Sequence, residues 1–291
     1  MSRSLRNAVL LLLGLGLALT LGSCATRRGG EAEGWRTGLF CGGDEGAREA
    51  ARLNADGLTG VTVNVFGRPE QGWALYAPQI AETIETRCAP QTPAFAAALA
   101  RWSARHGLPA SGVVDSASLT ALKITWQARR PFVTLRGQGI CPDPPPDSVL
   151  AATGPGEDLG KSVRLRQRAL WAYRRMVADA RRDGVIPPDQ PQLLALFSGY
   201  RDPAADAARC AAQANCLGLV RAACSAHRTG LALDLNLGSL PGLTVDNSAD
   251  ANRLFQTQTP AYRWLVRNAA RYGFVNYVFE PWHWEWTGEA P

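Results

Sequence analysis

Histidine is scarce in this chain: its 291 residues include only His106, His227 and His283. A site that needs imidazoles must therefore draw on these three. Lysine is rarer still, since Lys123 and Lys161 are the only lysines among 31 basic residues. No G-x-S-x-G sequence occurs, which excludes hydrolases that carry a nucleophilic serine on such a turn. The hydrophobic content of 46% is typical of globular proteins and excludes a collagen-like or wholly disordered chain.

The N-terminus has the pattern of an export signal. Arg3 and Arg6 form a positive region, followed by an apolar run from Ala8 to Leu21 that is short for a transmembrane helix. The run ends in L-G-S-C, at Leu21 to Cys24, and this sequence resembles a bacterial lipoprotein cleavage box. The resemblance implies a signal peptide over residues 1–23 and a lipid on Cys24. No later segment is apolar enough to span a bilayer, so we expect an anchored protein rather than an integral one.

Two residues near this box refine the expectation. Gly22 is less usual there, so ordinary secretory cleavage remains the alternative. Ala25, in place of Asp, favours the outer membrane of a Gram-negative host, with the protein facing the periplasm. Cleavage removes two arginines and lowers the formal charge from +6 to +4. Outside the cytoplasm, so modest a basic excess does not predict a nucleic-acid partner.

Six cysteines remain once Cys24 is set aside, and an even number in an exported chain predicts disulfides. They are Cys41, Cys88, Cys141, Cys210, Cys216 and Cys224. A bridge from Cys41 to Cys88 would staple the N-terminal part, and Cys210 with Cys216 could form a local one. Cys224 could be a ligand or nucleophile, but an oxidising compartment favours a disulfide.

The first folded unit is expected over residues 41–130, after a polar tether over residues 24–40. Its helices are predicted at 73–87, from Pro93 behind the N-cap Thr92 to Gly107, and after the N-cap Asp115. This pattern indicates a small helical bundle. His106 falls at a helix end, where a histidine caps the last carbonyls more often than it catalyses.

The stretch from Phe95 to Leu122 resembles the three-helix peptidoglycan-binding domain of many cell-wall enzymes. This chain departs from the usual pattern at residues 102–103, where that family has Phe-Gln, and at residues 111–112, where it often has Asp-Gly. The resemblance implies that the unit contacts peptidoglycan. An unrelated helical spacer is the alternative.

The second unit is expected over residues 141–291, with its Pro- and Gly-rich start at 141–160 either a linker or an ordered loop. Helices are predicted at 162–182, 203–213 and 262–272; strands are predicted at 193–197, 230–238 and 274–286, the last interrupted at Pro281. Mixed helices and strands in this order indicate an α+β fold.

Two short segments of this unit carry the chemistry. Residues 225–234 read S-A-H-R-T-G-L-A-L-D, and residues 280–283 read E-P-W-H. Together they supply two imidazoles, one carboxylate as a third ligand and a spare carboxylate beside the second imidazole. These are the side chains of a catalytic zinc site with an open coordination position and a general base.

Local geometry explains how these side chains could meet. Alternation along 230–238 places leucines on the core side and Asp234 on the opposite, cleft-facing side. Gly230 allows close approach in the turn before that strand. Glu280 and His283 would point to opposite faces of a regular strand, but Pro281 breaks the ladder between them, so both can converge on one ion.

The order of four motifs resembles a known family. They are S-G-Y-R at 198–201, S-x-H-x-x-G-x-A-x-D at 225–234, N-A-A-R-Y-G-F at 268–274 and E-P-W-H-W at 280–284. They are similar to those of VanY-type D-alanyl-D-alanine carboxypeptidases, within the LAS-type zinc peptidase superfamily. The resemblance covers about residues 140–290 and implies an antiparallel sheet flanked by helices.

The same resemblance implies roles for the site residues. His227, Asp234 and His283 would bind Zn²⁺, with a water as fourth ligand whose pKa the zinc can bring to about 7. Glu280 would act as general base and then general acid.

Arg201 would position the substrate through its carboxylate or carbonyl. Ser225 would offer a hydrogen bond, and Trp282 would help to shape a groove for a short peptide. A surface ion pair and a turn hydroxyl are the alternative interpretations of Arg201 and Ser225.

The sequence thus predicts a monomeric, envelope-anchored zinc carboxypeptidase that removes the terminal D-alanine from peptidoglycan stem peptides. L,D-carboxypeptidases and endopeptidases share the fold and site, so these specificities remain open. A zinc-bearing lipoprotein that only binds peptidoglycan is the non-enzymatic alternative. Glu280 argues against it, because a module that only binds does not need an acid/base beside the metal.

Overall fold

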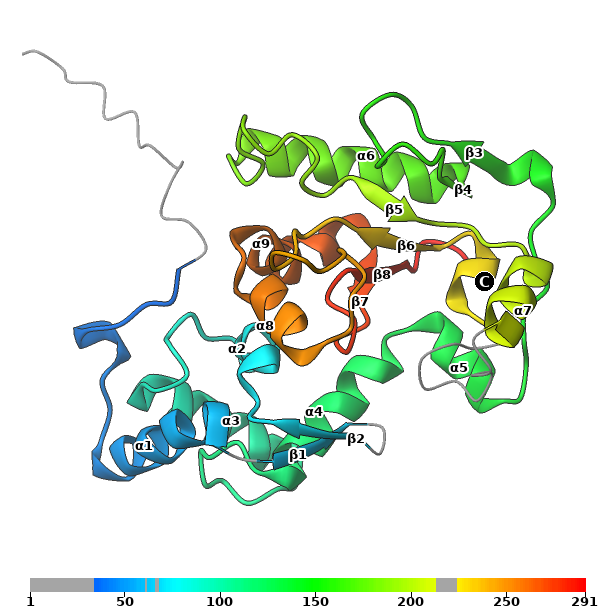
Figure 1. Cartoon of the computed structure of the whole chain (residues 1–291). Coiled ribbons are helices and arrows are strands. Elements are labelled where there is room, and N and C mark those ends of the chain that lie inside the picture. The colour runs from blue at the N-terminus through cyan, green and yellow to red at the C-terminus, as the bar shows by residue number, and fades with distance from the viewer. Residues whose placement is uncertain (1–33, 61, 66–67, 213–223) are drawn as a thin grey trace, which may run out of the picture.

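The structure, a computed structural model, describes residues 34–60, 62–65, 68–212 and 224–291. Cys24 and Cys216 lie outside these ranges, so the lipidation site and the expected Cys210–Cys216 bridge are not tested. Within the described ranges, no helix combines the length and apolarity needed to cross a bilayer. In Figure 1 the blue and cyan elements of the first half lie on one side, α6 lies on the other, and the main sheet runs between them.

The first part of the chain is mainly helical. In order, its elements are η1 (Leu39–Cys41), α1 (Glu45–Gly60), β1 (Thr62–Val65), β2 (Arg68–Gln71), η2 (Ala74–Tyr76), α2 (Ala77–Thr83), α3 (Pro93–Arg105), α4 (Ser116–Ala128) and α5 (Pro131–Gly137). The two strands form an antiparallel hairpin. Helix α1 was not expected from the sequence, because its buried face consists of Ala50, Ala51, Asn54 and Gly57 and forms no apolar stripe.

The two predicted N-caps are confirmed, whereas the helix expected over 73–87 is divided into η2 and α2 and ends at Thr83. The Thr92 hydroxyl accepts a hydrogen bond from the backbone N–H of Phe95, with Pro93 in the first helical position. Asp115 forms a reciprocal capping box with Ser118. His106 ends α3, and its Nδ1 lies 2.8 Å from the carbonyl oxygen of Trp102, in line with a capping role.

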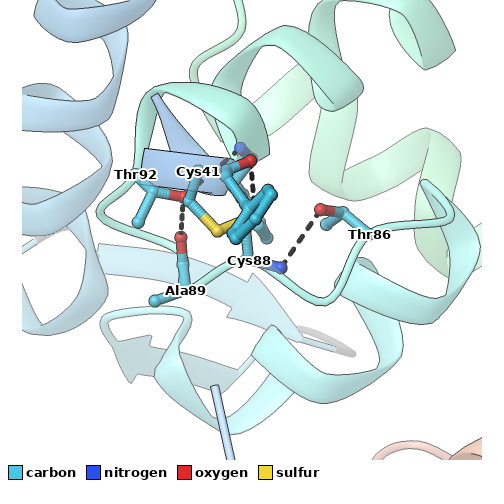
Figure 2. Close-up of a disulfide and its surroundings, with 7 residues drawn as sticks. Cys41, Thr86, Cys88, Ala89 and Thr92 are labelled. Atoms are coloured by element: carbon cyan, nitrogen blue, oxygen red, sulfur yellow. Dashed lines mark hydrogen bonds between the residues drawn. A yellow bond between two sulfur atoms is a disulfide. The ribbon is translucent and has the colours of Figure 1, made fainter. Parts of the chain in front are cut away.

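The disulfide between Cys41 and Cys88 is present, with the two Cα atoms 5.6 Å apart. Figure 2 shows it beside the turn that leads into α3, where the Thr92 hydroxyl donates to the carbonyl oxygen of Ala89 at 2.7 Å. The bridge therefore ties η1 to the segment between α2 and α3, as the sequence predicted.

The second part has an α+β fold. Its elements are η3 (Asp147–Val149), β3 (Leu150–Ala152), β4 (Arg164–Arg166), α6 (Gln167–Arg182), β5 (Leu196–Ser198), α7 (Pro203–Ala212), η4 (Ala226–Thr229), β6 (Ala232–Leu235), α8 (Asp250–Gln258), α9 (Pro260–Asn268), η5 (Ala269–Tyr272), β7 (Phe274–Asn276) and β8 (His283–Trp286). A four-stranded antiparallel sheet has the order β5-β6-β8-β7. Its apolar side chains share one core with those of α6 and α9, which confirms the expected flanked sheet.

Three sequence predictions in this part were wrong in detail. The strand expected over 193–197 is β5, which spans only Leu196–Ser198. The helix expected from Ser162 begins at Gln167, because residues 164–166 pair with residues 150–152 as β4 and β3. The strand expected over 274–286 is a hairpin, in which Phe274 pairs with Trp286 and Asn276 with Trp284. Apolar alternation looks the same in one long strand and in two short ones that fold back on each other.

The loop of this hairpin joins the two parts of the molecule. Val278 and Phe279 leave the sheet and pack into the core of the helical part, where the Phe279 ring meets Tyr76 edge to face, with centroids 6.0 Å apart. The Gln79 amide on α2 donates to the side-chain oxygen of Asn276 at 3.1 Å. The helical part is therefore packed directly against the segment that leads to Glu280.

Candidate metal centre and substrate cleft

The sheet register brings two of the expected ligands together. Asp234 on β6 and His283 on β8 are directly paired residues of neighbouring strands. His227 lies in η4, the short turn before β6, which ends at Gly230 with a left-handed φ of 70°. The four leucines that alternate with Asp234, at positions 231, 233, 235 and 237, are all in the core. The predicted alternation is thus confirmed.

The donor atoms of the three ligands converge. Nε2 of His227 lies 3.2 Å from Oδ2 of Asp234 and 3.2 Å from Nδ1 of His283. Nδ1 of His283 lies 2.9 Å from Oδ1 of Asp234. Ligands of a tetrahedral zinc ion, each at about 2.0–2.1 Å from the metal, lie about 3.3 Å from one another. Two imidazoles and a carboxylate at this spacing, all buried, fit a zinc ion.

His227 is oriented by the backbone. Its Nδ1 donates to the carbonyl oxygen of Gly199 at 2.7 Å, which leaves the lone pair of Nε2 facing the other ligands. Gly199 packs so tightly that an added Cβ would lie 2.5 Å from the carbonyl oxygen of Arg164. This glycine, in the S-G-Y-R motif, therefore serves the metal site through its backbone.

The second nitrogen of His283 faces a carboxylate that the sequence reasoning missed. Nε2 of His283 lies 3.4 Å from Oε1 of Glu285, which is 3% exposed. Glu285 in turn forms a buried salt bridge with Arg130, whose Nη2 lies 2.5 Å from the same oxygen. Alternation in W-H-W-E-W placed Glu285 on the face of His283. No local signal marked Arg130, which is 155 residues away.

The charges of two of the three candidate ligands favour cation binding, and that of the third opposes it. Burial lowers the pKa of His227, and the positive charge of Arg201 adds to this effect, which favours the neutral imidazole. Burial alone would raise the pKa of Asp234, but the two imidazoles hold it well below its ordinary value. For His283, burial is outweighed by the carboxylates of Asp234 and Glu285, which raise its pKa to about 9. A metal that binds here must therefore displace a proton.

Glu280 lies in a tight turn beside the ligands. Its backbone N–H donates to the carbonyl oxygen of Tyr277, and its own carbonyl accepts from the N–H of His283, both at 2.8 Å. This turn around Pro281 is how residues three apart come to line the same cleft. Burial raises the pKa of the Glu280 carboxyl, and the negative charge of Asp234 adds to the rise against the pull of His283.

Arg201 and Ser225 lie in contact with each other. The Arg201 guanidinium donates to Oγ of Ser225 at 2.8 Å, to Oδ1 of Asp206 at 2.9 Å and to Oγ of Ser198 at 3.3 Å. Ser225 also caps η4 by accepting from the backbone N–H of His227. Ser225 thus holds both the guanidinium and the ligand-bearing turn.

Trp282 is 4% exposed and packs in the core of the sheet, although it also lines the cleft. Little of its ring is therefore open to a substrate. Tyr277 was missed as a second aromatic residue of the lining: its ring meets His283 edge to face, with centroids 5.8 Å apart. Burial raises the pKa of Tyr277 to about 12, so it carries its proton at neutral pH.

The cleft above the ligands has a volume of about 920 Å³. Its lining comes from both parts of the chain and holds more basic than acidic side chains. The helical part contributes Glu70, Arg130, Phe132, Val133, Arg136 and Gly137. A hollow of this size accommodates a short peptide.

A disulfide joins Cys141 to Cys224, a residue of the cleft lining, with the two Cα atoms 6.0 Å apart. It fastens the start of the second part to the residue before Ser225. The expectation that Cys224 is a disulfide partner rather than a ligand is confirmed. Cys210 is disulfide-bonded as well.

Comparisons with known proteins locate this site in a family. The model of the VanY family, D-alanyl-D-alanine carboxypeptidase, matches residues 162–289. A structure of the LdcB LD-carboxypeptidase is 22% identical, with a TM-score of 0.36 and coverage of 50% of this chain and 70% of the other. A mutant of the vancomycin resistance D,D-pentapeptidase VanY, in complex with Zn(II), is 20% identical, with a TM-score of 0.28 and coverage of 50% and 83%. No curated protein matches the chain.

The family match spans β4 to β8 and so includes the whole sheet, the three candidate ligands and Glu280. Residues 162–289 of this chain match the VanY family model and form a VanY-type peptidase domain.

Proposed function

We propose that this protein is a zinc-dependent carboxypeptidase that removes the terminal D-alanine from peptidoglycan stem peptides. The observation that carries the proposal is a carboxylate outside the ligand set, that of Glu280, in the same cleft as the convergent atoms of His227, Asp234 and His283. A purely structural zinc site is closed by protein ligands, whereas three ligands leave a position for water or substrate.

Each site residue then has a definite task. His227, Asp234 and His283 would hold the zinc ion, which when bound supplies Lewis acidity and makes a water nucleophilic near neutral pH. The water oxygen bonds to the carbonyl carbon of the last peptide bond, and Glu280 takes a proton from it. The carbon–nitrogen bond then breaks, and Glu280 returns that proton to the departing amine of D-alanine.

Arg201 would bind the free carboxylate that defines a carboxypeptidase substrate. Ser225, Asp206 and Ser198 hold its guanidinium, so little side-chain freedom is lost when a substrate binds. The excess of basic side chains in the cleft would also attract the carboxylate end of an anionic stem peptide. The aromatic side chain of Tyr277, with the small exposed part of the Trp282 ring, would form its wall.

The test uses purified residues 25–291 and muropeptides with pentapeptide, tetrapeptide or tripeptide stems. We expect mass spectrometry to show loss of one alanine from the pentapeptide, arrested by a chelator and restored by zinc. Loss of alanine from the tetrapeptide instead would indicate an L,D-carboxypeptidase, and internal fragments an endopeptidase. A protein that holds about one zinc and releases no product from any stem would be the binding lipoprotein.

The proposed location is the cell envelope, with the protein tethered to a membrane by lipid on Cys24. The support is the L-G-S-C sequence after an apolar run. In the native host, the full-length chain is expected in the membrane fraction, and Cys24→Ser should move it to the soluble fraction or leave an uncleaved precursor. Unchanged processing and fractionation of the variant would contradict lipidation.

A further inference from the structure

We infer that Arg130 of the helical part is a positioning residue for the metal ligand His283 and that it acts through Glu285. The inference rests on the metal site of the proposed function. It also gives the helical part a task beyond contact with a polymer, because the catalytic centre would be incomplete without it.

Arg130 is fixed from three sides. Its Nε and Nη2 donate to Oε1 of Glu285 at 3.0 and 2.5 Å, and its Nη1 donates to Oε1 of Gln127 at 2.6 Å. The guanidinium also lies over the ring of Tyr277, 4.0 Å from its centroid. The side chain is 7% exposed, and that of Glu285 is 4% exposed. A planar cation held in this way has one available position.

Glu285 passes this restraint to the metal ligand. It lies two residues after His283 on β8, on the same face of the strand, and its Oε1 is 3.4 Å from Nε2 of the imidazole. A carboxylate on Nε2 keeps the proton there and directs the lone pair of Nδ1 to the metal. The oxygen that contacts His283 is the one that Arg130 binds, so moving Arg130 moves the partner of the ligand.

The energetics of burial make the arrangement dependent on Arg130. A carboxylate that is almost fully buried is stable as an ion only with a paired cation. Without Arg130, the remaining cationic partner of Glu285 among the described residues would be the His283 imidazole itself. The carboxylate would then turn towards His283 or towards solvent, and the ring would lose its orientation.

A second contact shows that the helical part supports the same segment. Gln79 on α2 binds the side-chain oxygen of Asn276, while the amide nitrogen of Asn276 donates to the carbonyl oxygens of His283 at 2.9 Å and Pro281 at 3.3 Å. Helix α2 of the first part therefore supports the backbone around His283. Arg130, which follows the end of α4, supports the imidazole of His283 through Glu285.

The experiment measures metal affinity in residues 25–291, by chelator competition, and the visible absorption of the cobalt-loaded protein. Arg130→Met should weaken zinc binding about 10–100-fold, the range expected when an outer partner of a ligand is lost, and should alter the cobalt spectrum. Arg129→Met is the matched control, because Arg129 is the exposed neighbouring arginine outside the cleft lining, and it should change neither readout.

A double-mutant cycle distinguishes positioning from general stabilisation. If Arg130 acts through Glu285, Arg130→Met combined with Glu285→Gln should bind zinc no more weakly than the worse single variant. The inference would be overturned if the losses of zinc affinity in the two single variants multiply in the double variant. It would also be overturned if Arg130→Met binds zinc with wild-type affinity. If Arg130→Met does not fold, the test uses Arg130→Lys, which keeps the positive charge but cannot donate two hydrogen bonds to Glu285. A folded Arg130→Lys protein with wild-type zinc affinity would overturn the inference. Absence of zinc from the wild type would instead refute the proposed function.

Discussion

Replacing Glu280 with glutamine is expected to lower the rate of D-alanine release about 10²–10⁴-fold, while zinc remains bound. The side chain keeps its shape but can no longer take up a proton from the attacking water or deliver one to the amine. Burial raises the pKa of the wild-type carboxyl towards the working pH, and a general base is most effective there. The three ligands do not include Glu280, so metal content should stay at the wild-type value.

Two measurements make this expectation specific: initial rates on a pentapeptide muropeptide and zinc stoichiometry of the same sample. Glu289→Gln is the control. Glu289 lies near the C-terminus, forms salt bridges with Arg166 and Arg168, and does not line the cleft. It should retain wild-type activity. A Glu280→Gln protein with nearly full activity would rule out the proposed base, and loss of its zinc would show that Glu280 supports the metal.

Arg253→Met is expected to lower the free energy of unfolding by about 3–5 kcal/mol, because it leaves a buried carboxylate without its cation. The Arg253 guanidinium on α8 forms a salt bridge with Glu70 on β2, and the Tyr76 hydroxyl donates to Oε2 of Glu70 at 2.5 Å. The side chains of Arg253 and Glu70 are 4% and 10% exposed. This network joins the helical part to the peptidase domain.

Chemical denaturation monitored by tryptophan fluorescence measures the loss. Arg271→Met, at an exposed arginine on η5, should change stability little. The double variant Arg253→Met with Glu70→Gln should be more stable than Arg253→Met alone, because it no longer buries an unpaired charge. A single variant as stable as the wild type would show that the network does not couple the two parts of the chain.

The ligand set could be predicted because its determinants are local. Asp234 is marked by alternation with leucines, and His227 lies a short turn before the same strand. Glu280 and His283 are separated by a proline that prevents a regular ladder. The structure brings His227, Asp234 and His283 together as expected. Lipidation of Cys24, the domain boundaries and peptidoglycan binding by the helical part stay predictions.

The supporting contacts could not be predicted, because they join residues distant along the chain. The β7–β8 hairpin was interpreted as one strand, since alternation does not reveal where a strand turns back. Strand β4 was interpreted as the start of a helix, because its pairing with β3 depends on a loop of irregular sequence. Nothing near Arg130 indicates that its partner is Glu285.

The sequence by itself identified the groups to which we assign the chemistry and the face of the strand that carries Asp234. Short-range periodicity and turn residues specify those features over a few residues. Only the tertiary structure decided which carboxylate contacts His283, which arginine binds that carboxylate, and that the helical part packs against the loop before Glu280. These contacts depend on how two cores pack against each other, and burial selects a partner by distance in space, not by distance along the chain.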